Sequence, residues 1–298
     1  MTVIQRIALD EKDPVKINSA INQLAEYLDR QSPRTVLAAD TTFYVRADGS
    51  DANTGTANTA VSGWLTFQHA MDVLAGSYDF NAKNVTVQIG NGTYTAGVNV
   101  NPWVGGGTLT FLGDNTTPTN VVISVASGGI PTGSCFMVQN GALPGALNIK
   151  GFQIKTSGTG TFGIYAAQAC NITPGNLDFG PCVTSHIFMA SGGYYNYTNT
   201  YSISGGADRH IHSNAGGIIF ATGNVAGTVT ISAAVAITTF AFAQEGGVIQ
   251  PATATNYVNP GNVTGTKYSV TSNAVINSAG ITFPGTIAGA TATGGQYI

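Results

Sequence analysis

The clearest pattern in the chain is an alternation of apolar and polar residues that recurs in register. Three aligned segments each end in a pair of glycines: Ser185–Gly193, Arg209–Gly217 and Thr239–Gly247. Their glycine pairs are offset by 24 and 30 residues, and related segments precede the first by 23 residues and follow the last by 27. Alternation with a period of two predicts β-strands, and degenerate repeats of about 20 to 30 residues predict a solenoid.

A second strand recurs upstream of these segments. Its copies are Phe152–Ile154, Leu177–Phe179, Tyr201–Ile203 and Val229–Ile231. We expect Ile164, Ile187 and Ile211 to point inward and to stack coil upon coil, with small residues at the corners. Residues 85–275 leave room for about eight coils of roughly 24 residues each. The sequence therefore predicts an all-β solenoid over this range.

The first 39 residues have a different pattern, which predicts a helical arm. Asp13 and Pro14 form a good helix start, as N-cap and first helical residue. A seam about two heptads long follows, made by Ile17, Ile21, Leu24 and Leu28. This stripe either packs on its own domain or mediates self-association or docking to a larger assembly. Docking is favoured because a Ser-Pro-Arg break at 32–34 separates it from the solenoid, so we expect residues 1–39 to be an attachment or trimerisation arm.

Composition narrows the classes of function. Charged residues make up 8% of the chain and the net charge is −3, which gives no electrostatic basis for binding nucleic acid or an anionic membrane. The most apolar run, Ile231–Ala243, is too short to cross a bilayer, and the N-terminus lacks the apolar core of a signal peptide. Three unevenly spaced cysteines, Cys135, Cys170 and Cys182, are expected to be buried free thiols. No cofactor is expected.

A strand, a loop and a helix precede the solenoid. Phe43–Arg46 reads as the strand, and an Asp/Asn/Gly-rich loop follows at 47–55. The second half of Gly63–Ala75 predicts a helix with one apolar face, formed by Phe67, Ala70, Met71 and Leu74. This arrangement resembles the N-terminal cap of pectate-lyase-like right-handed parallel β-helix proteins, and Val85–Tyr94 resembles their first coil. The resemblance, over residues 41–274, implies that fold, with a cap at 40–84, but no particular chemistry.

Shorter strings resemble a narrower group. Residues 113–122 and the closing stretch from Phe283 look like the β-helix tail fibres and tailspike-like proteins of phages and prophages. The start of the N-terminal helix at Lys12 looks like that of phage tail proteins. This resemblance implies a homotrimeric virion appendage, made in the host cytoplasm and located in the virion tail. It would end in a C-terminal extension at 276–298 and dock to a tail or baseplate protein through its arm.

Carboxylates suitable for polysaccharide cleavage are few. Beyond residue 115 the acids are Asp178, Asp208 and Glu245, and the repeat register places them in different columns of one subunit. Asp208, beside Arg209, is the best candidate acid, although a turn-capping role is simpler. We therefore expect no catalysis within one subunit, and a site shared between subunits remains an alternative.

An oxygen-rich loop offers a possible cation site. Asp48, Asp51 and Asn53 have oxygens that suit Ca²⁺. The same residue types also cap turns and tolerate unusual dihedral angles, which is the simpler interpretation.

Tyrosines and amides cluster at the start of one coil. Aromatic faces and neighbouring amides suit the binding of sugars, which predicts a glycan site at Tyr194, Tyr195, Asn196, Tyr197 and Asn199. The competing interpretation is that alternate tyrosines fill the core. Tyr201, which shares a column with Leu177 and Val229, is expected to be interior.

Two columns of aromatic residues are expected to face outward if Ile187 and Ile211 face inward. They are His186, His210 and Phe240, and Phe188, His212 and Phe242, with Tyr165 extending the second. An apolar stripe along a rod is best buried against copies of itself, so these residues are the predicted trimer interface. The spacing of His210 and His212 also makes them a weak candidate pair for a metal on the trimer axis.

Together these features predict a tail-fibre-like protein that binds a host-surface polysaccharide without cleaving it. The alternatives are a polysaccharide depolymerase, either a lyase or a glycoside hydrolase, and a purely structural fibre segment.

Overall fold

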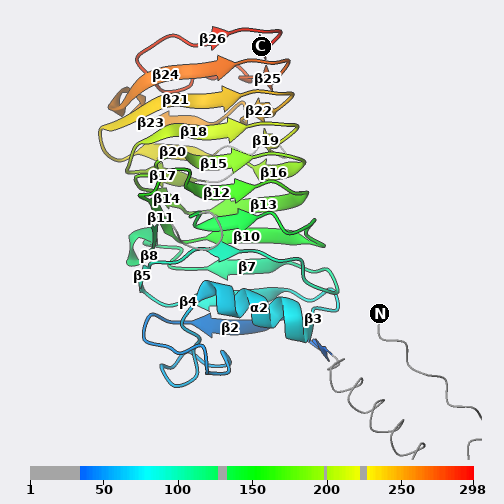
Figure 1. Cartoon of the computed structure of the whole chain (residues 1–298). Coiled ribbons are helices and arrows are strands. Elements are labelled where there is room, and N and C mark those ends of the chain that lie inside the picture. The colour runs from blue at the N-terminus through cyan, green and yellow to red at the C-terminus, as the bar shows by residue number, and fades with distance from the viewer. Residues whose placement is uncertain (1–33, 127–132, 198–199, 222–226) are drawn as a thin grey trace, which may run out of the picture. The chain divides into compact units, whose positions relative to one another are not determined.

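A computed structural model of the chain describes residues 34–126, 133–197, 200–221 and 227–298. The chain divides into two compact units, residues 1–35 and 36–298. The predicted arm helix, with Ile17, Ile21, Leu24 and Leu28, lies outside the described residues, as does Asn199. The second unit is a stack of β-strands (Figure 1).

Three parallel sheets form the stack; from β4 to β24 each successive coil adds one strand to each sheet, and β2, β25, β26 and β27 extend only the ten-stranded or the eight-stranded sheet. The ten-stranded sheet contains β2 (Thr41–Val45), β4 (Val85–Ile89), β7 (Leu109–Leu112), β10 (Ala146–Lys150), β13 (Cys170–Gly175), β16 (Gly193–Asn196), β19 (Ile218–Phe220), β22 (Val248–Gln250), β25 (Val275–Ile276) and β27 (Gln296–Tyr297). The seven-stranded sheet contains β5 (Gly92–Tyr94), β8 (Val121–Val125), β11 (Gln153–Thr156), β14 (Asp178–Phe179), β17 (Tyr201–Ile203), β20 (Thr228–Ile231) and β23 (Asn256–Val258). The eight-stranded sheet contains β6 (Val98–Asn99), β9 (Phe136–Val138), β12 (Phe162–Ala166), β15 (Ser185–Met189), β18 (Ala207–Ser213), β21 (Val235–Ala243), β24 (Val263–Val270) and β26 (Ala290–Thr291).

The remaining elements are short and lie mostly at the N-terminal end or at corners. They are the helix α2 (Phe67–Ser77), the paired strands β1 (Thr35–Val36) and β3 (Tyr78–Asp79), and the 3₁₀ turns η1 (Pro118–Asn120) and η3 (Pro260–Asn262). No helix within the described ranges is long and apolar enough to cross a membrane.

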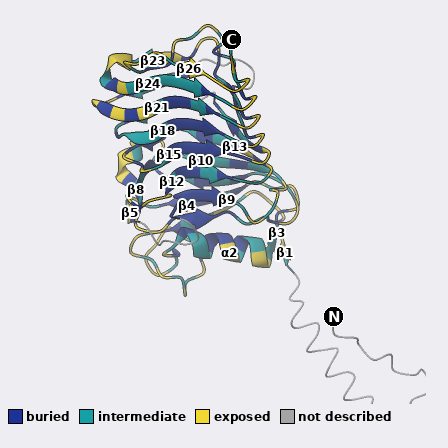
Figure 2. Ribbon diagram, turned by 45° about the horizontal axis from the view of Figure 1, so that its top comes forward, coloured by how far each residue is buried: buried dark blue, intermediate teal, exposed yellow. Residues whose placement is uncertain are grey.

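The all-β class and the parallel β-helix are confirmed, as is the register of the repeats. Ile187 pairs with Ile164 on one side and with Ile211 on the other, and all three are fully buried. In the strand that recurs upstream, Phe179 pairs with Ile154 on one side and with Ile203 on the other. Figure 2 shows buried residues recurring along the stacked strands. Each coil thus buries its apolar face against its neighbours.

The glycine pairs mark a tight turn between the eight-stranded and ten-stranded sheets. At each such corner two consecutive residues have positive φ, as in Glu245 (51°) and Gly246 (73°), and the flanking residues are joined by a hydrogen bond from Gly247 N to Gln244 O (2.9 Å). The first glycine of a pair adopts this left-handed conformation at little cost. The second lies against the coil below, because a Cβ on Gly247 would come within 2.5 Å of Ser213 O.

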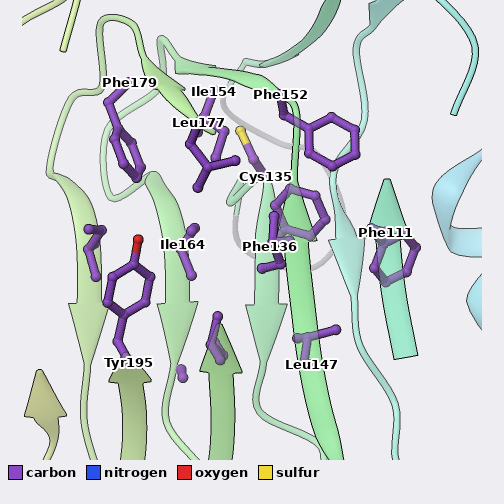
Figure 3. Packing of buried hydrophobic residues seen from close by; sticks show 14 of the residues in the cluster. Phe111, Cys135, Phe136, Leu147, Phe152, Ile154, Ile164, Leu177, Phe179 and Tyr195 are labelled. Carbon is purple, nitrogen blue, oxygen red and sulfur yellow. The ribbon is translucent and has the colours of Figure 1, made fainter. Parts of the chain in front are cut away.

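α2 closes the N-terminal end, as the sequence predicts. Phe67, Ala70, Met71 and Leu74 are all buried, and the Phe67 ring contacts the rings of Phe111, Phe136 and Phe152. Figure 3 shows these last three rings close together in the core. The helix begins at the N-cap Thr66, whose hydroxyl accepts a hydrogen bond from His69 N (3.1 Å). The side-chain amide of Gln68 pairs with the edge strand β6: Oε1 accepts from Asn99 N (2.8 Å).

The stack extends beyond both ends of the predicted 85–275 range. β2, assigned to the cap, already pairs in parallel with β4. At the other end β27 pairs with β25 and β26 pairs with β24, so residues 276–298 continue two of the sheets. Phe283 is 1% exposed, and its ring contacts those of Phe240 and Tyr257. The predicted C-terminal extension is therefore part of the solenoid and covers the end of its core. The three cysteines are free and buried, as predicted.

Candidate functional site

The three acids considered as candidates for catalysis lie in different settings. Asp178 is 3% exposed, and its carboxylate accepts hydrogen bonds from Gln153 Nε2, Ser202 Oγ and Ser204 Oγ, each at 2.6 Å. Asp208 lies near the start of β18, with Arg209 Nε 3.6 Å from its carboxylate. Glu245 is exposed at a glycine corner. The carboxylate of Asp178 is thus hydrogen-bonded to neighbouring side chains of the core. Asp178 lies in β14, Asp208 in β18 and Glu245 at a corner, so the three acids lie in different columns, as expected.

The Asp/Asn/Gly loop uses its side chains to hold itself together. Asp51 Oδ1 accepts from the backbone N–H groups of Leu65 and Thr66, and its Oδ2 accepts from Thr66 Oγ1 (2.7 Å), which fixes the start of α2. Asp48 forms a two-point ion pair with Arg46 at 2.8 and 3.0 Å. Asn53 Nδ2 donates to the carbonyls of Ala60 and Gly63. These contacts favour the turn-capping interpretation over the Ca²⁺ site.

The first of the two aromatic columns points inward, so its predicted outward orientation is wrong. His186, His210 and Phe240 are each 0% exposed. The parallel pairing skips this position: Ser185 pairs with Arg209 and Ile187 with Ile211, with no pair between them. The strand alternation is interrupted at this position, so two consecutive residues, His186 and Ile187, face the core. The prediction that these three residues form a trimer interface fails with that orientation.

The buried histidines belong to a chain of hydrogen bonds. His186 Nε2 donates to the Gly180 carbonyl (3.0 Å), which can only accept. His210 Nδ1 lies 2.9 Å from His186 Nδ1, and His210 Nε2 lies 2.7 Å from the Tyr201 hydroxyl. The Tyr201 hydroxyl donates to the Tyr197 oxygen (2.6 Å), and the Tyr197 and Tyr257 oxygens lie 3.2 Å apart.

Burial keeps these imidazoles uncharged at neutral pH. It lowers the pKa of His186 to about 4, because the ring is removed from water. Burial, together with the neighbouring His186, lowers the pKa of His210 well below its usual value. The network is therefore a polar part of the core.

The second aromatic column lies on the outer face of the eight-stranded sheet. Centroids are 5.2 Å apart for Tyr165 and Phe188, 4.4 Å for Phe188 and His212, and 5.0 Å for His212 and Phe242. Phe188 is buried but is not part of the central hydrophobic cluster. The Arg209 guanidinium lies 4.2 Å from the centre of the Phe242 ring. We call Tyr165, Phe188, His212 and Phe242 the outer ladder; its role in a trimer stays a prediction.

His210 and His212 do not converge on a metal. His210 belongs to the core network, whereas His212 is part of the outer ladder. The two rings therefore lie on opposite sides of the sheet. Burial and the neighbouring Arg209 lower the pKa of His212 to about 3. In the described parts of the chain no three His, Cys, Asp or Glu side chains gather as a metal site.

The tyrosine cluster is divided between core and surface. Tyr195 is 0% and Tyr197 4% exposed, so neither can stack on a sugar (Figure 3 shows the Tyr195 ring among core side chains). Tyr201 is buried, as predicted. Tyr194 and Asn196 are partly exposed on the outer side of β16. Among the predicted glycan residues that the structure describes, these two lie at the surface.

Their neighbours on the outer face of the ten-stranded sheet were not predicted as a group. Strand pairing places Asn171 beside Tyr194 and Phe220 beside Asn196, and Thr173 lies two positions after Asn171 on the same face. We call Asn171, Thr173, Tyr194, Asn196 and Phe220 the amide–aromatic face. The repeat register could have revealed it, because outward positions of paired strands fall at the same spacing as inward ones.

Two hollows flank this face. One, of about 410 Å³, is lined mainly by small residues, including Ala146, Ala169 and Asn171. The other, of about 300 Å³, includes Lys150, Thr173 and Asn176. β10 and β13 connect them, since Ala146 and Lys150 are the ends of β10 and Asn171 and Thr173 belong to β13. The surface is thus concave at both sides of a flat strip of amides, hydroxyls and rings.

Comparison with known proteins gives no match. Neither a family model, nor a curated protein, nor a solved structure matches this chain.

Proposed function

We propose that the protein is a rigid, non-catalytic rod that binds a surface polysaccharide of a bacterial host, as an appendage of the phage tail-fibre kind. The observation that carries this proposal is the amide–aromatic face with its two flanking hollows. Aromatic rings stack on the apolar faces of sugars, while amides and hydroxyls bond their hydroxyl groups. A β-helix holds such groups at fixed spacing, so little conformational entropy is lost on binding.

Cleavage is less well supported than binding. Glycosidases place two carboxyl groups on either side of the scissile bond, at most about 10 Å apart. Here Asp178 is covered and hydrogen-bonded, Asp208 lies beside Arg209, and Glu245 occupies a corner. None of the three belongs to the amide–aromatic face.

The assembly follows the same proposal. Residues 1–39 attach the rod to a tail or baseplate protein, the outer ladder lies between three copies, and the protein resides in the virion tail after synthesis in the host cytoplasm. The chain's division at residues 35 and 36 supports a separate arm. The rings of the outer ladder support a partner surface. Phe188 and His212 are only 9% and 4% exposed within one subunit, so a partner would bury little more of them. Tyr165 and Phe242 would therefore supply most of the new contact.

A binding array of bacterial capsular and lipopolysaccharide glycans tests the function. We expect the full chain to bind at least one glycan and to release no new reducing ends or unsaturated uronates from it. Tyr194→Ala should weaken binding about fivefold, because an aromatic contact contributes about 1 kcal/mol. Tyr44→Ala, on β2 of the same sheet, is the matched control and should bind normally.

Two outcomes would contradict the proposal. New reducing ends or unsaturated uronates would make the protein a depolymerase. A folded protein that binds none of the glycans would leave the structural fibre as the function.

A further inference from the structure

We propose that the polysaccharide is acidic and that Lys150 binds the carboxylate of one of its sugars. This inference rests on the proposed glycan-binding function and adds the chemical class of the ligand.

Lys150 is positioned beside the amide–aromatic face by the strand that carries it. It is the last residue of β10, and it shares its outward face with Asn148, two positions earlier, and Ala146, four positions earlier. Its stem lies against Gly175 of the next coil, where a Cβ would come within 3.0 Å of Lys150 Cγ. Because that position is a glycine, the side chain can lie along the surface and line the 300 Å³ hollow.

The hollow offers hydrogen-bonding groups around the ammonium. Asn115, Thr173, Asn176 and Thr200 line it together with Lys150. Asn176 Nδ2 donates to Asn115 O (2.8 Å), which ties two coils together at the rim. A sugar carboxylate seated here would accept from the ammonium, while its ring hydroxyls face the amides and hydroxyls of the wall.

Lys150 has no acidic partner within the described residues. The ion pairs formed there join Arg46 to Asp48 and Arg209 to Asp208. Asp114, one coil below the Gly151 corner, directs its carboxylate to its own loop, where it accepts from Thr116 N and Thr117 N. An unpaired ammonium beside a polar hollow attracts an anion.

Lys150 is distinctive because the other described side chains on this face carry no charge. The other outward side chains of the described ten-stranded sheet are uncharged; from β4 to β22 they are Thr86, Gln88, Thr110, Leu112, Ala146, Asn148, Asn171, Thr173, Tyr194, Asn196, Ile218, Phe220, Val248 and Gln250. With no carboxylate on the face, an acidic glycan meets no repulsion. A neutral glycan could accept hydrogen bonds from the ammonium but would lack the attraction between opposite charges.

The hollow and the aromatic ring are within reach of one short oligosaccharide. Tyr194 lies two coils above β10 and four positions back along the strand direction from Lys150. With a rise of about 3.3 Å per residue and about 4.8 Å between strands, the two positions are separated by about 16 Å. The acidic sugar would occupy the hollow, with the following sugars crossing Thr173 towards Tyr194.

The test uses the full chain and a printed array of bacterial polysaccharides that includes both acidic and neutral ones. We expect the bound polysaccharides to carry carboxylates, and chemical reduction of those carboxyl groups to alcohols to weaken binding about tenfold. Lys150→Gln should cause a similar loss, and Lys150→Arg should retain most of the affinity. Raising the salt concentration should weaken the wild type more than Lys150→Gln.

Lys155→Gln is the matched control. Lys155 lies on β11 of the seven-stranded sheet, and its stem rests on Gly180 as that of Lys150 rests on Gly175. This variant should bind like the wild type, and circular dichroism should show that each variant is folded.

The outcomes separate the two proposals. Binding of neutral polysaccharides, or binding that survives carboxyl reduction or Lys150→Gln, would overturn the acidic class and leave the glycan-binding function standing. Binding that depends on phosphate or sulfate groups would overturn the carboxylate while keeping an anion at Lys150. Absence of binding to any member of the array would overturn both proposals.

Discussion

At the scale of single residues, the alternation of a strand predicts most orientations but fails where the parallel pairing omits a position. Ile187 and Ile211 are inward, and Phe188 and His212 are outward, as a period of two requires. His186 breaks the rule at such a position inside β15, and nothing in its own sequence marks the interruption. The equivalent position one coil earlier is Gly163, where a Cβ would meet His186 O at 2.5 Å. That glycine is a sign of crowding, but one sequence does not identify it as such.

The buried histidines predict a loss of stability in mild acid. The pKa of His186 is lowered from 6.5 to about 4 by burial, so the unfolded chain binds a proton at a pH where the folded chain does not. The stability is complete above about pH 6.5 and is lost as the pH falls towards 4. At pH 5 the loss from His186 alone should be about 2 kcal/mol, and His210 adds a loss in the same direction. Guanidinium unfolding at pH 7 and pH 5 measures it.

Variants assign this pH dependence. His186→Phe combined with His210→Phe should reduce it, since Phe240 shows that the same column accepts a phenyl ring, and the part that remains belongs to His212, whose pKa burial also lowers. His69→Gln, outside the network, should keep the wild-type dependence. If the wild type is equally stable at pH 7 and pH 5, the histidines are not held neutral as described.

At the scale of elements, the repeat register was predictable because the glycine pairs have two separate physical reasons. The first glycine adopts a positive φ and the second has no room for a Cβ, which is why the pair recurs at 192–193, 216–217 and 246–247. The pair Gly294–Gly295 carries the same signal, with Thr293 at φ 47°, and it would have placed β27 in the stack. By contrast, the amide–aromatic face was only half predicted. Tyr194, Tyr195 and Tyr197 look alike in sequence, and only the direction of each side chain separates them.

The interaction of α2 with the edge of β6 gives a second prediction. Gln68 Oε1 accepts from Asn99 N at 2.8 Å, and Asn99 is 5% exposed, so Gln68→Ala would leave a buried N–H without a partner. The cost should be about 1–3 kcal/mol in the free energy of unfolding. Asp72→Ala, one turn further along the same helix but exposed, should cost less than about 0.5 kcal/mol. Equal stability of Gln68→Ala and the wild type would show that the edge needs no such bond.

At the scale of the whole molecule, the sequence predicted the solenoid and its capping helix because each coil repeats one physical solution. The ends were harder to predict because they lack a repeat. Phe283 fills the core beside Phe240 and Tyr257, yet a lone Phe-Pro-Gly string resembles any loop. The assembly and the ligand depend on surfaces, and a surface leaves a weaker pattern in the sequence than a core does.

Removal of the first 35 residues tests the independence of the rod. The chain divides at this point, so residues 36–298 should fold and keep the β-sheet circular dichroism and, within a few degrees, the melting temperature of the full protein. Under the proposed function the same deletion should abolish incorporation into virions. Loss of the sheet signal would mean that the first 35 residues belong to the core.

The position of α2 at the start of the stack has a consequence for biosynthesis. The ribosome delivers α2 and β4 first, so a finished template exists before the later coils emerge. At about 5–20 residues per second, a coil of about 25 residues emerges roughly every 1–5 s and can add to the one before it. The growing edge is then always the newest strand, which is open to pairing with other nascent chains. Once residues 276–298 have emerged, Phe283 covers the core at that end, and β23, β26 and β27 stay as the edge strands of the described sheets.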